Sequence, residues 1–105
     1  MGSREVFEIK PPTDTRNTYF DFTGDLAVAE TISTQVTTAT VFSGTDANPA
    51  AIISGSATAS GAIVTQKLTA GTLGVVYTLL CTITTSAGQT LTRAGYLAIL
   101  KEATV

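Results

Sequence analysis

The chain has 105 residues, of which 13% are charged and 44% are hydrophobic, and its net charge at pH 7 is −2. This length fits one domain, and the composition is too apolar and too weakly charged for a disordered chain. The six Lys and Arg residues are dispersed and do not form the basic cluster that nucleic-acid binding requires. We therefore expect one folded domain that does not bind nucleic acid.

The N-terminal segment, residues 1–13, is predicted to be either the first strand of the domain or an arm that reaches a neighbouring subunit. Phe7 and Ile9 share one face of an extended chain and are the candidate interface residues of such an arm. The pair Pro11-Pro12 ends the strand because proline has no N–H for a sheet ladder. The segment lacks the apolar stretch of a secretory signal. Residues 14–105 are then the main domain.

The next two segments also have strand patterns. Residues 18–25 alternate, with Phe20 and Phe22 on one face. Residues 29–44 are rich in β-branched side chains, which disfavour a helix and predict one bent strand or two strands. In that segment we expect Ile32 and Val36 to share the buried face. A loop with Gly, Asp, Asn and Pro follows at residues 43–50.

Two further strands are predicted in the middle of the chain. Residues 51–61 are small and apolar, which suggests a weak or edge strand. Residues 62–71 place Val64, Gln66 and Leu68 on one face. The segment from Gly71 to Gly74 is too short and too apolar for a phosphate-binding loop and is predicted to be a turn.

The most apolar stretch, residues 75–100, is predicted to form a β-hairpin. Threonines interrupt its apolar residues at short intervals, so it falls short of the ~18–20 consecutive apolar residues of a membrane span. Its first half alternates through Tyr77, Leu79, Cys81 and Ile83, and the sequence "SAGQ" at residues 86–89 provides the turn. We therefore expect no membrane-spanning segment here.

About seven short strands without a helix longer than two turns predict an all-β fold, an immunoglobulin-like antiparallel sandwich, with a small barrel as the alternative. The predicted core is the set of apolar residues on the shared strand faces: Phe20, Phe22, Ile32, Val36, Val64, Leu68, Tyr77, Leu79, Cys81, Ile83, Leu97 and Ile99.

The residues offer little chemistry for catalysis or metal binding. The chain has no histidine, and its single cysteine, Cys81, lies in an apolar strand pattern without a nearby base, which predicts an inert core thiol. Asp21, Asp25 and Glu30 fit turns and a solvated strand face better than an acid–base pair or a calcium site. We expect no enzyme activity, cofactor or metal.

Tyr77 follows a Gly-rich stretch, and this pattern predicts a tyrosine corner, in which the hydroxyl bonds the backbone at one corner of a sandwich. A plain core tyrosine is the alternative. The residues predicted to have a structural role are Tyr77 at this corner and four residues of the predicted core: Leu79, Cys81, Phe20 and Phe22.

Surface composition differs along the chain. Seven of the eight carboxylates lie at or before Asp46, and threonine occurs 21 times in the sequence. The C-terminal half therefore offers a neutral, Thr-rich surface, which suits packing against another protein subunit.

Several motifs together resemble a known pattern. They are "KPP" at 10–12, "FDF" at 20–22, "ETI" at 30–32, "LTAGTLGVVYTL" at 68–79, "TITTSAGQT" at 82–90 and "YLAIL" at 96–100. The chain resembles the fibre–tail adaptor-like family of small virion proteins of tailed bacteriophages, most closely in the C-terminal hairpin.

This resemblance implies a non-enzymatic structural protein of the virion, made in the host cytoplasm, that joins tail or neck to a fibre. Its implied partners are tail, neck, fibre or capsid subunits, and the resemblance implies a homo-oligomer in the particle. A capsid decoration protein is the close alternative. An immunoglobulin-like receptor- or sugar-binding module is the alternative from another functional class.

Overall fold

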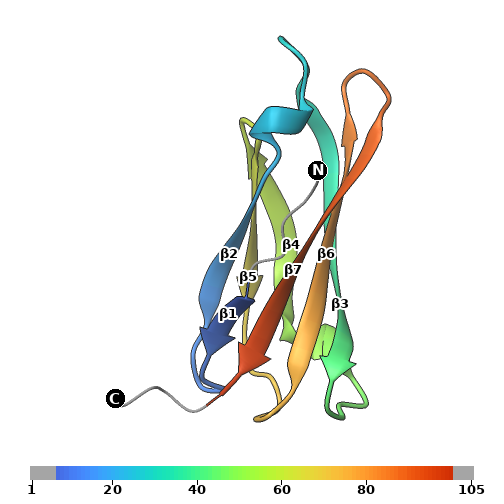
Figure 1. The fold of residues 1–105 in the computed structure, drawn as a ribbon. Helices are drawn as coiled ribbons and strands as arrows, with labels where there is room; N and C mark the ends of the chain where they lie inside the picture. The colour runs from blue at the N-terminus through green and yellow to red at the C-terminus, as the bar shows by residue number, and fades with distance from the viewer. Residues whose placement is uncertain (1–6, 101–105) are drawn as a thin grey trace.

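A computed structural model describes residues 7–100, and within them the chain is all-β. It has seven strands and two short 3₁₀ helices (Figure 1). In chain order they are β1 (Phe7–Lys10), β2 (Arg16–Asp21), η1 (Thr23–Asp25), β3 (Ile32–Ser43), η2 (Pro49–Ile52), β4 (Ile53–Ser60), β5 (Ile63–Leu68), β6 (Val76–Thr85) and β7 (Thr90–Ile99). The predicted all-β class is confirmed.

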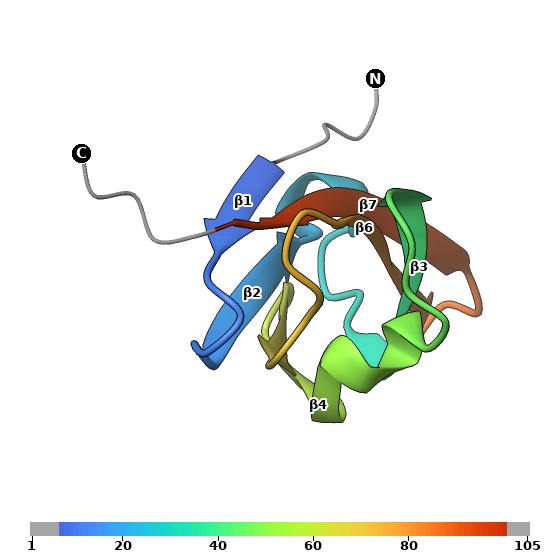
Figure 2. The same cartoon turned by 90° about the horizontal axis from the view of Figure 1, so that it is seen from below.

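The strands form two layers, which Figure 2 shows end-on. A four-stranded sheet has the order β1-β7-β6-β3, and a three-stranded sheet has the order β2-β5-β4. The neighbours β3-β6-β7 and β2-β5-β4 are those of an immunoglobulin-like sandwich. The predicted sandwich is therefore confirmed.

One strand pair departs from the antiparallel prediction. β1 pairs with β7 in parallel, from Phe7 opposite Tyr96 to Lys10 opposite Ile99. The ladder stops there because Pro11 and Pro12 cannot donate to it, and β2 lies in the other sheet. Residues 7–10 thus pair with the last strand of their own chain, and whether residues 1–13 act as a strand or as an arm stays a prediction. Residues 1–6 and the side chains of residues 7–9, including Phe7 and Ile9, lie outside what the structure describes.

The core lies between the two sheets and follows the predicted alternation. Ten of the twelve predicted core residues are buried: Phe20, Phe22, Val64, Leu68, Tyr77, Leu79, Cys81, Ile83, Leu97 and Ile99. Ile52, Val75, Ala39 and Ala57 complete the apolar cluster. The alternation of apolar residues was sufficient to predict the buried faces of β2, β5, β6 and β7, because each of these strands has one face on this single core.

Val36 was predicted on the wrong face. Its side chain is 54% exposed, and Ile32 is only partly buried. The pairing of β3 with β6 shifts register between Ile32 and Thr34, so one extra residue reverses the alternation downstream. Thr37 and Ala39 therefore face the core in place of Val36.

The C-terminal hairpin forms as predicted. β6 and β7 pair from Val76 opposite Ala98 to Thr84 opposite Thr90, and residues 86–89 make the turn. β4 is an edge strand, as its weak pattern suggested, because β5 is its only neighbour in the sheet. Within residues 7–100, no helix has the length and hydrophobicity needed to cross a bilayer.

Candidate interaction surfaces

The outer face of β3, β6 and β7 carries no charged side chain. Fifteen residues of these strands alternate with the core-facing ones: Thr34, Val36, Thr38, Thr40, Phe42, Val76, Thr78, Leu80, Thr82, Thr84, Thr90, Thr92, Ala94, Tyr96 and Ala98. Eight of them are threonines. By contrast, the outer face of the other sheet includes Asp21 and Lys67. We call this set of fifteen residues the neutral face.

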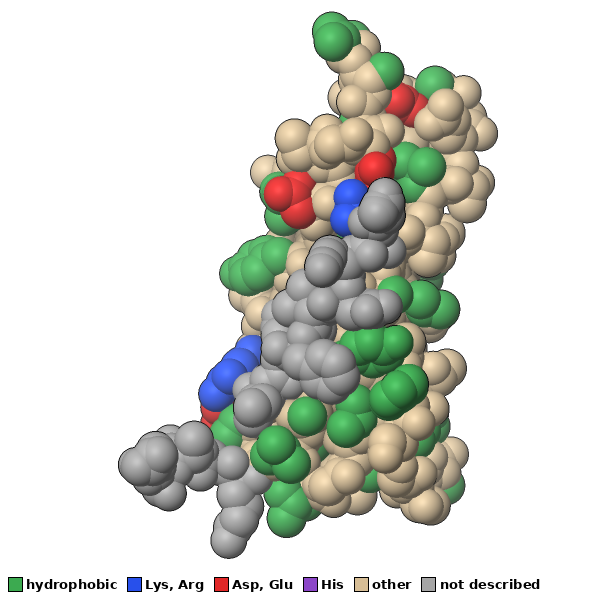
Figure 3. Space-filling model, in the orientation of Figure 1, with side chains coloured by type: hydrophobic (Ala, Val, Ile, Leu, Met, Phe, Trp, Pro, Cys, Tyr) green, Lys and Arg blue, Asp and Glu red, His purple; other side chains and the backbone are tan. Residues whose placement is uncertain are grey.

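The middle of the neutral face is apolar, and most of its other apolar side chains lie toward the end where β6 starts. Leu80 lies on its central strand, β6, and is 37% exposed, while Phe42 on β3 is 58% exposed. The rings of Phe42 and Tyr96 lie 4.8 Å apart between centroids, so they meet over β6, the strand between them. Figure 3 shows hydrophobic side chains gathered on the lower part of this face, with no red or blue among them. An apolar centre bordered by polar, uncharged groups is the usual composition of a protein–protein contact.

A second exposed apolar surface is the turn at residues 27–30, which projects at the end of the sandwich beside the β6–β7 turn (Figure 1). Val28 is 99% exposed at its tip. The Glu30 amide donates to the Ala27 carbonyl at 3.0 Å, and the Ala27 amide donates to Oε1 of Glu30 at 2.8 Å. Ala29 has φ 71°, the sign that the third residue of a type II turn requires. The turn is therefore hydrogen-bonded at its base and presents an apolar tip.

The base of this turn is also tied to the C-terminal hairpin. The Thr31 amide donates to Oγ of Ser86 at 3.0 Å, and the Ser86 amide donates to the Thr31 carbonyl at 2.8 Å. Two loops that are distant in sequence thus form one end of the molecule.

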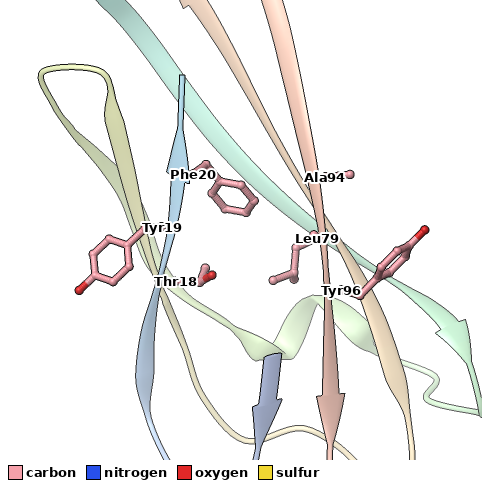
Figure 4. A pocket seen from close by; sticks show the side chains of 7 residues that line it. Thr18, Tyr19, Phe20, Leu79, Ala94 and Tyr96 are labelled. Carbon is pink, nitrogen blue, oxygen red and sulfur yellow. The ribbon is translucent and has the colours of Figure 1, made fainter. Parts of the chain in front are cut away.

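A small pocket opens at the seam between the sheets. It measures about 60 Å³ and is lined by Thr18, Tyr19, Phe20, Leu79, Ala94, Gly95 and Tyr96. Figure 4 shows Phe20 and Leu79 directed into the gap between the sheets, whereas Tyr19 and Tyr96 point outward. Small-molecule sites usually measure ~300–1,000 Å³, so this pocket is far too small for a sugar or a cofactor.

Tyr77 lies at the base of the molecule, where it joins two loops. Its hydroxyl accepts a hydrogen bond from the Thr72 amide at 2.9 Å and donates one to Oδ2 of Asp46 at 2.5 Å. The side chain is fully buried at the start of β6. A backbone bond to a residue just upstream is the geometry of a tyrosine corner, with Asp46 as an additional partner.

The other residues considered as catalytic or metal-binding candidates are hydrogen-bonded, ion-paired or buried within the fold. Asp21 accepts hydrogen bonds from the amide and hydroxyl of Thr23, and Asp25 forms an ion pair with Arg93 at 2.6 Å. Glu30 holds the turn described above, and Cys81 is fully buried. Among residues 7–100, no three His, Cys, Asp or Glu side chains gather closely enough to hold a metal ion.

The comparison with protein families bears on function. Residues 10–98 match the family model described as podophage GP4 fiber-tail adaptor protein gp77. The chain belongs to this adaptor family. No curated protein sequence matches it. The match confirms the family resemblance and begins at Lys10, so it covers every strand from β2 to nearly the end of β7.

Several surface residues of this adaptor-family chain were missed in the sequence. Val28 lies in "DLAVAE", where four small or apolar residues interrupt a polar loop between two acids, and that interruption was the available signal. Leu80 was predictable in principle, since it alternates with the buried Leu79 and Cys81. Phe42 could not be placed before the register shifts of β3 were known.

Lys10 was missed for a different reason. Its side chain is 1% exposed, and Nζ donates to the carbonyls of Pro11 at 2.9 Å and Ala70 at 2.5 Å. Burial lowers the pKa of this amine. A lysine next to two prolines suggests a solvated strand end, and the bond to the distant Ala70 carbonyl could not be read from the sequence.

The Cys81 thiol should be unreactive in the native protein. Burial raises its pKa to about 11, so almost no thiolate is present at neutral pH. We expect a maleimide to label Cys81 only after denaturation, and mass spectrometry of native and guanidinium-treated samples measures this. Rapid stoichiometric labelling of the native protein would contradict the prediction.

The stability of the domain should fall in acid. The Tyr77 hydroxyl holds the pKa of Asp46 below its ordinary value of 3.8, and the Ala27 amide holds that of Glu30 below 4.5. A carboxylate whose pKa is lower in the folded state stabilises the fold above its unfolded pKa, and this contribution is lost as the pH falls through the folded pKa. We therefore expect the melting temperature to drop as the pH is lowered below these ordinary values.

Asp46→Asn isolates one carboxylate. The difference in melting temperature between the parent and the Asn variant should shrink between about pH 7 and about pH 2.5, because the parent loses its charge there. A difference that stays constant over this range would contradict the assignment to Asp46.

Proposed function

We propose that this chain is a non-enzymatic structural protein of a tailed-phage virion that joins the tail or neck to a fibre. The family match over residues 10–98 is the observation that carries the proposal. The placement of Cys81, Asp21, Asp25 and Glu30 in structural contacts also supports a role without catalysis. In this role the protein acts through buried contacts with other subunits.

An adaptor must contact more than one neighbour, and two separate apolar surfaces support this. The neutral face lies along one side of the sandwich, and the Val28 turn projects from one end. The turn is suited to enter an apolar pocket on a tail or fibre subunit. Its internal hydrogen bonds reduce the loss of conformational freedom on binding.

The partners in this proposal are other virion proteins, and the chain is present in several copies because virion parts are symmetric. The protein is made in the host cytoplasm and acts in the particle. The alternative role of a decoration protein would place the chain on the capsid shell. The other alternative, a sugar-binding module, is not supported, because the pocket at the β2–β7 seam is too small for a sugar.

Fractionation of the virion tests the proposal. Particles are dissociated into tails and emptied capsids, and an antibody against this chain locates it in each fraction. We expect it with the tails, in a copy number that is a small multiple of the tail symmetry. Recovery with the capsids would overturn the adaptor role and favour decoration.

Val28→Asp tests the turn. The fold should be unaffected, because the side chain is 99% exposed, but incorporation into particles should fall because a charge cannot enter an apolar pocket. Leu73→Asp is the matched control. Leu73 is another apolar loop residue, 52% exposed, and it lies in the connection between β5 and β6. Equal incorporation of the Val28 variant and the parent would show that the turn makes no essential contact.

A further inference from the structure

We propose that the neutral face binds the same face of a second copy of this chain. The inference deepens the multi-copy role proposed above by naming the surface through which two copies meet. It depends on three observations: the charge pattern of the face, the position of its apolar centre, and its area.

The charge pattern favours a second copy. In a two-fold contact each residue near the axis meets its own counterpart, so any charge near the centre would face a like charge. All fifteen residues of the neutral face are uncharged, although the chain carries fourteen charged residues elsewhere, six basic and eight acidic. A face that binds only a different protein has no such restriction, because the partner could supply opposite charges.

The apolar centre also suits a two-fold contact. Leu80 is on the middle strand of the three, opposite Thr38 on β3 and Ala94 on β7. Val36 lies to one side of Leu80 along the face, and the Phe42–Tyr96 ring pair lies to the other. A two-fold axis that lies between the two faces, runs across the strands and passes near Leu80 brings the Val36 side of one copy over the ring pair of the other. Threonines surround this centre and can hydrogen-bond at the rim.

The area fits a weak, reversible contact. Strands of ten residues span ~33 Å, and three strands spaced at ~4.8 Å span ~14 Å. The face therefore covers roughly 480 Å² in projection, about 60% of the ~800 Å² per partner of a standard interface. Such a contact should be reversible in solution and stronger where several copies are held together.

Sedimentation velocity measures the association. The protein is examined from about 10 μM to about 1 mM, a range that detects a weak dimer. We expect a reversible monomer–dimer equilibrium. Leu80→Glu should weaken it by about 100-fold or more, since two carboxylates would meet at the centre. Thr58→Glu, on the exposed side of β4 in the other sheet, should leave it unchanged.

A second variant guards against misfolding of the first. Leu80→Thr resembles its neighbours on the face and should fold normally, as circular dichroism would show, yet weaken the dimer by about 10-fold through lost apolar burial. A monomer at every concentration, or a dimer that both Leu80 variants leave intact, would overturn the proposal.

Cross-linking locates the contact. Leu80→Cys should be joined to itself by a short bismaleimide, because residues on packed sheets lie ~10 Å apart. Thr58→Cys is the matched control, and the parent gives the background from the buried Cys81. Cross-linking at position 58 but not at position 80 would place the contact on the wrong sheet and refute the inference. Location of the protein in the tail is tested separately, so the two proposals can fail independently.

Discussion

Replacement of Leu79 by alanine should lower the free energy of unfolding by about 2–5 kcal/mol, as expected for truncation of a buried leucine. Leu79 is 2% exposed on β6, between Tyr77 and Cys81 on the core face. It also lines the pocket at the β2–β7 seam, so the lost methyl groups would enlarge an existing space. For a domain near this size, each kcal/mol lowers the melting temperature by about 4 °C or more. Urea unfolding followed by circular dichroism measures the change.

Leu80→Ala is the matched control for this prediction. It removes the same atoms from the next residue of the same strand, but its side chain points to the opposite face and is 37% exposed. At a concentration where the protein is monomeric we expect a loss below about 1 kcal/mol. Equal losses for the two variants would mean that the two faces of β6 are assigned incorrectly.

Replacement of Gly71 by alanine should also destabilise the domain strongly. Gly71 has φ +107°, and a Cβ there would lie 2.7 Å from Cδ1 and 2.8 Å from Cγ1 of Ile99. Backbone strain costs about 1–3 kcal/mol, and overpacking a filled core costs about 1–3 kcal/mol. We therefore expect a loss of roughly 2–6 kcal/mol, measured by the same urea unfolding.

Two other glycines separate these causes. Gly74 has φ +88° but open space around its Cβ position, so Gly74→Ala reports strain without a clash. Gly24 has open space and no positive φ, so Gly24→Ala should be nearly neutral. The losses should rank Gly71, then Gly74, then Gly24. If Gly71→Ala and Gly74→Ala had the same effect, Ile99 would not restrict this corner.

Strands with one face on the core were predictable from the sequence, because burial imposes a period of two. In β6 four alternating apolar residues end at the "SAGQ" turn, and in β5 Val64, Gln66 and Leu68 follow the same rule. β5 pairs with β2 without a bulge, and β6 pairs with β7 without a bulge. Their buried faces were therefore assigned correctly.

The errors arose where long-range contacts override the local pattern. The register shift in β3 reverses the faces after Ile32, and it depends on how β3 pairs with β6, which no residue of β3 reveals alone. The parallel pairing of β1 depends on where β7 ends. The burial of Lys10 depends on the position of Ala70, whose carbonyl accepts its hydrogen bond.

The candidate surfaces were predictable only in composition. A neutral, Thr-rich C-terminal half was evident from the sequence, but the neutral face also takes one of its three strands, β3, from the N-terminal half. The Val28 turn depends on a left-handed alanine, which sequence rules assign to glycine. Which exposed residues lie together was therefore decided by tertiary structure.

The parallel pairing of β1 with β7 has a mechanical consequence. The two strands are the first and last of the domain, and Phe7 lies opposite Tyr96 while Lys10 lies opposite Ile99. Tension applied between the two ends of the chain would pull these strands lengthwise past each other, because the pulled end of β1 and the pulled end of β7 lie at opposite ends of their ladder. The ladder bonds would then resist together, and the bond from the buried Lys10 amine to the Ala70 carbonyl would add to them. A protein under tension along its chain would gain resistance from a strand of only four residues.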